Sequence, residues 1–149
     1  MKLETWTSLA SLALSVMFVA ILLSFYSFLI GPDGKGPERV VDPGALLIQE
    51  VFISAIPSLV LAGFTFFMAR SYGNFAGGLI LMAAGSIMIV GMVVGNTMVQ
   101  HIPRQYVVGG IDAVPYFFIA CGVGIIGAGG YLIVRARKKF EPTNLDDLR

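Results

Sequence analysis

"AVPYFFIACGVGIIGAGGYLIV", from Ala113 to Val134, is an apolar run without a charged side chain. Its length matches the roughly 20 residues that a helix needs to cross about 30 Å of hydrocarbon. Gly122, Gly124 and Gly127 spell G-x-G-x-x-G, which binds a dinucleotide only where it follows a strand and opens a helix. Here the apolar run continues on both sides of the glycines. The stretch therefore predicts a transmembrane helix, and we expect no nucleotide to bind.

The composition of the whole chain agrees with this interpretation. Of its 149 residues, 56% are hydrophobic and 13% are charged, and the mean hydropathy is +0.83. Soluble domains carry about 25% charged residues, so we expect an integral membrane protein. The formal net charge of +1 leaves no basic face for a nucleic acid, and no nucleic-acid partner is expected.

Four segments are long and apolar enough to span a bilayer. They cover about 5–30, 45–69, 75–99 and 113–134. The predicted fold class is all-α, an antiparallel bundle of four transmembrane helices joined by short connections. A single membrane domain covers 1–149, and its last part, 135–149, is expected to be a basic cytoplasmic tail that contacts lipid head groups.

Lysine and arginine residues set the expected orientation, because they are enriched in cytoplasmic segments. If the four helices alternate in direction, one side holds Lys2, Arg70, Arg135, Arg137, Lys138, Lys139 and Arg149. The other side holds only Lys35, Arg39 and Arg104. We therefore expect both termini to be cytoplasmic and the membrane to be the plasma membrane.

Small residues predict which helices pack closely, since they let helix backbones approach each other. The candidate packing residues are Gly77, Ala84, Gly91, Gly95, Gly124 and Gly127. On the segment 75–99, Gly77, Ala84 and Gly91 recur every seven residues, and Gly91 and Gly95 form a GxxxG. A matching stripe on the first segment consists of Ala13, Met17, Ala20, Ser24 and Ser27. We expect the first, third and fourth helices to meet along these residues.

Helix ends and one interruption are also marked. Asp42 followed by Pro43 is typical of a helix start, and Asp112 is expected to cap the last helix in the same way. Pro57 lies inside the second segment, where it removes a backbone hydrogen bond and is expected to produce a kink.

Glu50 is the one ionisable side chain expected within a membrane span, just inside the extracytoplasmic boundary. Such residues are functional candidates by default. Arg104 and Asp112 fall on the same side and complete a predicted polar cluster with Glu50. Structural pairing of Glu50 with Arg104 or Arg39 is the leading interpretation, and a proton or ion role is the alternative.

Metal binding receives little support. His101 and Met98 are one turn apart and are the weak candidate ligands, since imidazole and thioether bind copper. The chain has a single histidine and a single cysteine, so it offers no complete ligand set. We expect this chain alone to bind no metal and no cofactor, and the cofactor of any larger complex stays unknown.

The function expected from these features is that of a non-catalytic accessory subunit of a multi-subunit membrane complex, of the oxidase or copper monooxygenase type of oxidoreductase. Its partners would be other membrane subunits and lipid. The alternative is a small homo-oligomeric channel or transporter that uses Glu50. A membrane enzyme acting on a lipid or a quinone would have only His101, Arg104 and Asp112 available, and we expect no enzyme in the isolated chain.

Overall fold

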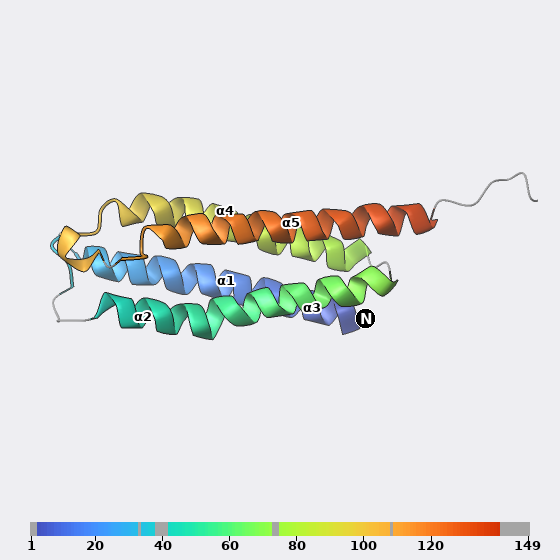
Figure 1. Ribbon diagram of the computed structural model, residues 1–149, viewed down its shortest axis with the longest axis horizontal. Helices are drawn as coiled ribbons and strands as arrows, with labels where there is room; N and C mark the ends of the chain where they lie inside the picture. The colour runs from blue at the N-terminus through green and yellow to red at the C-terminus, as the bar shows by residue number, and fades with distance from the viewer. Residues whose placement is uncertain (1–2, 33, 38–41, 73–74, 108, 141–149) are drawn as a thin grey trace, which may run out of the picture.

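The computed structural model describes residues 3–32, 34–37, 42–72, 75–107 and 109–140. Within these ranges every regular element is a helix (Figure 1). The elements are α1 (Leu3–Ile30), α2 (Pro43–Glu50), a π-helix (Val51–Ala55), α3 (Ile56–Tyr72), α4 (Phe75–Val99), a 3-10 helix (Arg104–Tyr106) and α5 (Ala113–Phe140). Four helical stretches are long and apolar enough to cross a membrane: Thr5–Ile30, Pro43–Arg70, Phe75–Val99 and Ala113–Arg137. They indicate a membrane protein, as the sequence predicts.

The four stretches run antiparallel along the long axis of the molecule (Figure 1). We call Pro43–Tyr72, which joins α2, the π-helix and α3, the second span. Observed and expected bounds agree closely except at the last helix, which continues to Phe140. Arg135 and Arg137 therefore belong to α5 and not to an irregular tail, because arginine is a good helix former and suits a helix C-terminus. The end of the expected tail, 141–149, lies outside the described residues.

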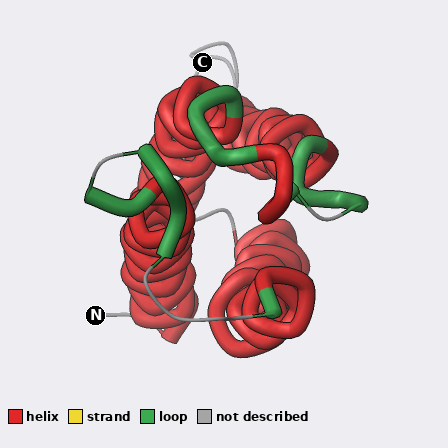
Figure 2. Tube along the Cα trace, turned by 90° about the vertical axis from the view of Figure 1, so that its left-hand side faces the viewer, coloured by secondary structure: helices red, strands yellow, loops and turns green. Residues whose placement is uncertain are grey.

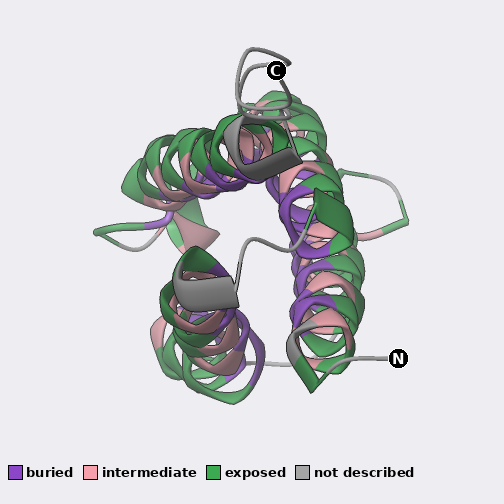
Figure 3. Cartoon of the chain, turned by 90° about the vertical axis from the view of Figure 1, so that its right-hand side faces the viewer, coloured by how far each residue is buried: buried purple, intermediate pink, exposed green. Residues whose placement is uncertain are grey.

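The order of packing places α4 between two neighbours. α4 packs most extensively against α5 and next against α1, while α1 also packs against α3. Direct contact of α3 with α4 and α5 is slight. Seen end-on, the helices stand around a common axis, with buried residues turned inward and exposed residues outward (Figures 2 and 3). The second span is thus held mainly by α1.

Glycines bring α4 and α5 together in a reciprocal way. A Cβ atom on Gly85 would lie 2.7 Å from the carbonyl oxygen of Gly122, and one on Gly122 would lie 3.0 Å from that of Gly85. Gly78 and Gly129 repeat this pairing, with distances of 2.9 and 2.7 Å to each other's carbonyl oxygen. We call this contact the glycine interface. Because the obstacle is backbone, no larger residue fits without moving a helix apart.

The predicted seam on α4 lies on the buried side of that helix. Gly77, Ala84, Gly91 and Gly95 are all buried. A Cβ on Gly91 would overlap the side chain of Val19, and one on Gly95 would lie 3.2 Å from the Tyr26 ring, so these two glycines face α1.

Gly124 and Gly127, in contrast, do not take part in this packing. Both are exposed, and a Cβ on either would meet no described atom within 4 Å. Their assignment to the packing of this bundle is wrong. Gly122 and Gly129 take that role because they lie on the side of α5 that faces α4.

The predicted stripe on α1 is also on the wrong side of its helix. Ala13, Met17, Ala20, Ser24 and Ser27 are all exposed. We call them the outward row. The apolar core contributed by α1 consists instead of Phe18, Leu22, Tyr26 and Leu29. On a helix that is apolar all round, hydrophobicity does not distinguish the side that faces protein.

The second span is interrupted by the π-helix Val51–Ala55, directly before Pro57. Its buried residues Glu50, Ser54, Ser58 and Ala62 follow one another in steps of four. A step of four residues is longer than the 3.6 residues of an α-helical turn. The wider turn of the π-helix keeps these buried residues on one side of the span. Pro57, which cannot donate to residue 53, is accommodated by the same turn. The span changes direction there, in agreement with the predicted kink (Figure 1).

The two predicted helix caps have different outcomes. Oδ1 of Asp42 accepts hydrogen bonds from the amides of Gly44 (3.0 Å) and Ala45 (3.2 Å), with Pro43 at the first helical position, as predicted. At the start of α5 the amides of residues 113 and 114 donate instead to the carbonyl oxygen of Gly110. Gly110 has a φ of 115°, a conformation that favours glycine.

Candidate functional site

Buried polar side chains gather on one half of the bundle. Among the described residues they are Ser8, Ser11, Ser15, Glu50, Ser54, Ser58 and Thr65. All belong to α1 or to the second span, which pack against each other. A buried polar side chain that no water reaches must find a hydrogen-bond partner within the protein. Polar groups without a partner are therefore most costly at this contact.

Serines join α1 to α3 near the middle of the bundle. The hydroxyls of Ser15 and Ser58 are 2.7 Å apart. Ser11 and Ser58 each have a hydroxyl that is directed to the other's carbonyl oxygen, at 3.3 and 3.4 Å. We call this contact, formed by Ser11, Ser15 and Ser58, the hydroxyl interface. Its hydroxyls all have partners, which assigns them a structural role.

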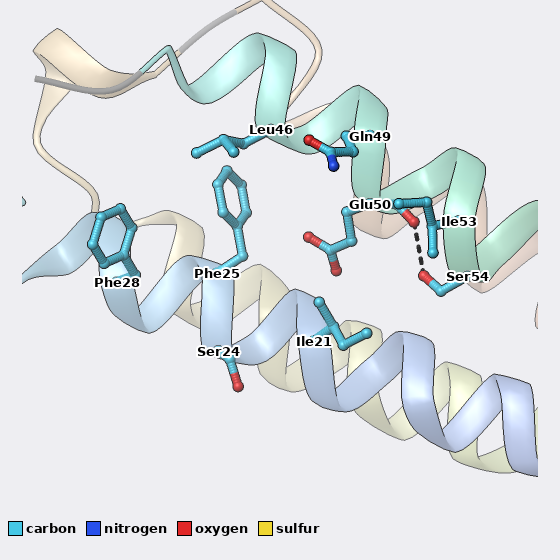
Figure 4. Close-up of a pocket in the computed structure, with 9 residues that line it drawn as sticks. All are labelled: Ile21, Ser24, Phe25, Phe28, Leu46, Gln49, Glu50, Ile53 and Ser54. Carbon is cyan, nitrogen blue, oxygen red and sulfur yellow. Dashed lines mark hydrogen bonds between the residues drawn. The ribbon is translucent and has the colours of Figure 1, made fainter.

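Glu50 ends α2 and lies nearly buried, with 8% of its surface exposed. Its Oε1 atom has no hydrogen-bond partner among the described residues. The hydroxyl of Ser54 lies one turn further on but donates to the main-chain carbonyl of Glu50, at 2.8 Å. Figure 4 shows the Glu50 carboxyl group directed away from its own helix, toward α1. The carboxyl is therefore buried without compensation from its own surroundings.

The carboxyl group of Glu50 points into a groove of about 440 Å³ between α1 and the second span (Figure 4). The groove is lined by Ile21, Ser24, Phe25, Phe28, Leu46, Gln49, Glu50, Ile53 and Ser54. We call it the Glu50 groove. Its rim residues Phe28 and Ile53 are 47% and 59% exposed, so the groove opens on the outer side of the bundle.

Tyr26 places a second unpartnered polar group beside this site. Its side chain is fully buried, and its hydroxyl has no hydrogen-bond partner among the described residues. Tyr26 near the end of α1, Glu50 near the start of the second span and Asp112 directly before α5 all lie toward the same end of the bundle. Two acidic groups and one phenol therefore share this end of the bundle.

The predicted cluster of Glu50, Arg104 and Asp112 is assembled only in part. Arg104 and Asp112 are exposed, and Arg104 lies on the 3-10 helix between α4 and α5. No ion pair joins Arg104 to Glu50 in the described part of the chain, so the pairing expected from the sequence does not form. Arg39, the other proposed partner of Glu50, lies outside the described residues.

The weak metal candidates lie apart from this groove. His101 is exposed, and its Nδ1 donates a hydrogen bond of 2.8 Å to the carbonyl oxygen of Thr97. Met98 is half-buried beside the core. Within the described ranges no group of three or more histidine, cysteine and acidic residues lies close enough together to hold a metal ion.

Comparisons of the chain with protein-family models, with curated proteins and with solved structures gave no significant match. The site is therefore interpreted from its own chemistry. Sequence reasoning found Glu50 but missed Tyr26 and the serines. The serines did leave a signal: Ser8, Ser11 and Ser15 recur at spacings of three and four in an apolar helix, which puts them on one side of it.

Proposed function

We propose that this chain is a non-catalytic accessory subunit of a multi-subunit membrane complex, inserted with both termini on the cytoplasmic side of the plasma membrane. The observation that carries the proposal is the outward row on α1, which lies opposite the core-facing side of that helix. Lipid solvates large apolar side chains well, whereas small outward-facing residues favour close approach of another helix. The outward row supports docking of a partner helix along α1.

Two further features support contact with other subunits. Gly127 adds a small residue to the outer side of α5, and Gly124 lines an open hollow between α3 and α5. The outward row also borders the Glu50 groove, because Ser24 belongs to both. A partner helix on α1 would therefore lie beside this groove. The type of complex, an oxidoreductase in the sequence-based hypothesis, stays a prediction.

The test is gentle detergent extraction of native membranes, separation by native size, and mass spectrometry of everything that co-migrates with this chain. We expect co-migration with larger subunits. Ala20→Leu, on the outward row, should release the chain from them. Ala83→Leu is the matched control, since Ala83 is exposed on α4 away from the row. Release by both variants, or by neither, would contradict docking through α1.

A homo-oligomeric channel is the second candidate, and the unpaired Glu50 is the observation that favours it. One carboxyl from each copy around a shared axis can select cations. This candidate predicts that the extracted protein has the mass of several copies of this chain alone and that Glu50→Gln abolishes cation flux into proteoliposomes. A hetero-complex without flux would exclude it.

A further inference from the structure

The Glu50 groove combines three properties that an ordinary packing gap lacks. It has the volume of a small-molecule site, for which about 300–1,000 Å³ is usual. Its walls are mainly apolar, with the rings of Phe25 and Phe28 and the side chain of Leu46 near one end (Figure 4). A nearly buried carboxyl oxygen without a partner points into it. Apolar walls with a few directional polar groups, here Glu50 and Gln49, are typical of ligand sites.

The charges around the groove restrict what the polar group can bind. In its ionised form the Glu50 carboxyl accepts hydrogen bonds and cannot donate them, so a partner of that form must supply a donor. Asp112, which is exposed directly before α5, is a second acidic group at the same end of the bundle. Arg104, exposed on its 3-10 helix, forms no ion pair with Glu50 in the described chain. An ionised Glu50 carboxyl therefore favours a cation with N–H groups as its partner.

The aromatic wall agrees with the same choice of ligand. Phe25 and Phe28 both line the groove with Glu50. Aromatic faces attract ammonium groups, and they pack equally well against an apolar body. Because the rim residues are exposed on the outer side of the bundle, an amphiphile can enter sideways without separating the helices.

We propose that the Glu50 groove is a binding site for a small amphiphile with an ammonium head group and an apolar body. The ammonium group donates to the Glu50 carboxyl, and the body lies against Ile21, Phe25 and Ile53. This assignment goes beyond the proposed accessory role and does not depend on it, because every residue of the site belongs to this chain.

Photolabelling of the purified full-length chain tests the proposal. The chain is placed in phosphatidylcholine nanodiscs and exposed to dodecylamine that carries a diazirine in its alkyl chain. We expect saturable labelling of the peptides that contain residues 21–28 and 46–53. Unlabelled dodecylamine should compete at least about tenfold better than dodecanol, which has the same chain and no charge. Equal competition by the two, or labelling spread over all helices, would overturn the proposal.

Two variants locate the effect in the carboxyl group. Glu50→Gln keeps the size and removes the charge, and should lower amine labelling by about tenfold or more. Ser86→Ala on α4 is the control outside the groove, because the Ser86 hydroxyl is likewise engaged with a main-chain carbonyl of its own helix. It should leave labelling unchanged. Unchanged labelling of a folded Glu50→Gln would overturn the proposal, and if that variant does not fold, the amine and alcohol competition in the wild-type chain decides.

Two other occupants are outcomes of the same experiment. If phosphatidylethanolamine in the nanodisc competes as well as dodecylamine, the groove accepts the ammonium head group of a membrane lipid, which supports the proposal and identifies the source of the amphiphile. If native membranes show no labelling while the isolated chain does, a partner subunit fills the groove and the proposal fails. Labelling in both settings supports it, and the co-migration test of the accessory role stands separately because it uses no amine.

Discussion

The glycine interface and the hydroxyl interface hold the same bundle together by opposite means. Between α4 and α5, the glycine pairs bring backbones so close that an added Cβ would meet a carbonyl oxygen at 2.7–3.0 Å. Between α1 and α3, Ser15 and Ser58 form a buried hydroxyl contact of 2.7 Å. The glycine interface uses shape alone, whereas the hydroxyl interface uses directional polar groups.

The comparison indicates which half of the molecule is free to bind something. The described glycine interface contains no buried polar side chain, so nothing there needs a further partner. The second span, held mainly by α1, leaves Glu50 and Thr65 with unpartnered oxygens. Close packing holds α4 and α5 together without polar contacts. The half formed by α1 and the second span has polar atoms left over that can bind another molecule.

The largest effect is expected where the glycine interface is broken. In Gly85→Leu the new side chain collides with the Gly122 backbone, and we expect a loss of about 3 kcal/mol or more in stability. Denaturation in mixed detergent micelles, followed by helical circular dichroism, measures it. Gly124→Leu is the matched control with open space and should cost little. Equal losses in both variants would contradict the packing described for α5.

Replacing the unpartnered carboxyl should have the opposite sign. Glu50→Leu removes a buried polar group without a partner, and we expect the isolated chain to gain about 1–3 kcal/mol in the same denaturation assay. A clear loss of stability would mean that Glu50 has a cationic partner, such as Arg39, as the sequence-based hypothesis supposed. Gln49→Leu, at the exposed rim of the same groove, should change stability less.

Breaking the hydroxyl contact should cost less. Ser15→Ala and Ser58→Ala are each expected to lose about 1 kcal/mol, because hydrogen bonds between membrane helices contribute modestly. A double-mutant cycle should give a coupling of about 0.6 kcal/mol. Ser86→Ala on α4, where the exposed hydroxyl bonds only within its own helix, is the control. A coupling near zero would show that the two hydroxyls do not stabilise each other.

The smallest effect is expected at Thr65. Its Oγ1 is buried and has no partner in the described chain, so Thr65→Val keeps the shape and removes an uncompensated polar atom. We expect a gain of about 1 kcal/mol or less. A loss in the denaturation assay would indicate that the Thr65 hydroxyl has a partner in the folded protein.

The lengths of the helices could be predicted, but on α1 the side that faces protein could not. Membrane-length apolar runs are visible in composition, and the bounds of α4 match those expected from the sequence. On α4 the small residues correctly marked the buried side, because a tight contact admits nothing larger. On α1, small residues occur both inside, as Ser11 and Ser15, and outside, as Ala13 and Ala20. On α1, side-chain size alone therefore could not predict which side of the helix faces the protein.

The candidate site was predictable for one residue and not for its surroundings. Glu50 stands out because charge is rare in an apolar segment. Arg104 was its expected partner because both residues were predicted at a similar depth in the membrane. Depth does not determine on which side of the bundle a residue lies. From the sequence, Tyr26 cannot be distinguished from any other aromatic residue of an apolar helix. Only the packing of α1 against α4 shows that its side chain is buried. Three-dimensional packing, and not residue chemistry, decides which polar groups meet.

The π-helix has a consequence for how the Glu50 groove exists at all. Each residue of an α-helix turns the chain by about 100°. The extra residue of the π-helix therefore rotates the part of the second span before it by about 100° relative to the part after it. Removal of a single residue from Val51–Ala55 would leave Ser58 facing α1. It would turn the carboxyl of Glu50 around the helix axis, out of the groove. The scaffold and the groove thus depend on different features of the same span, and gain or loss of one codon separates them.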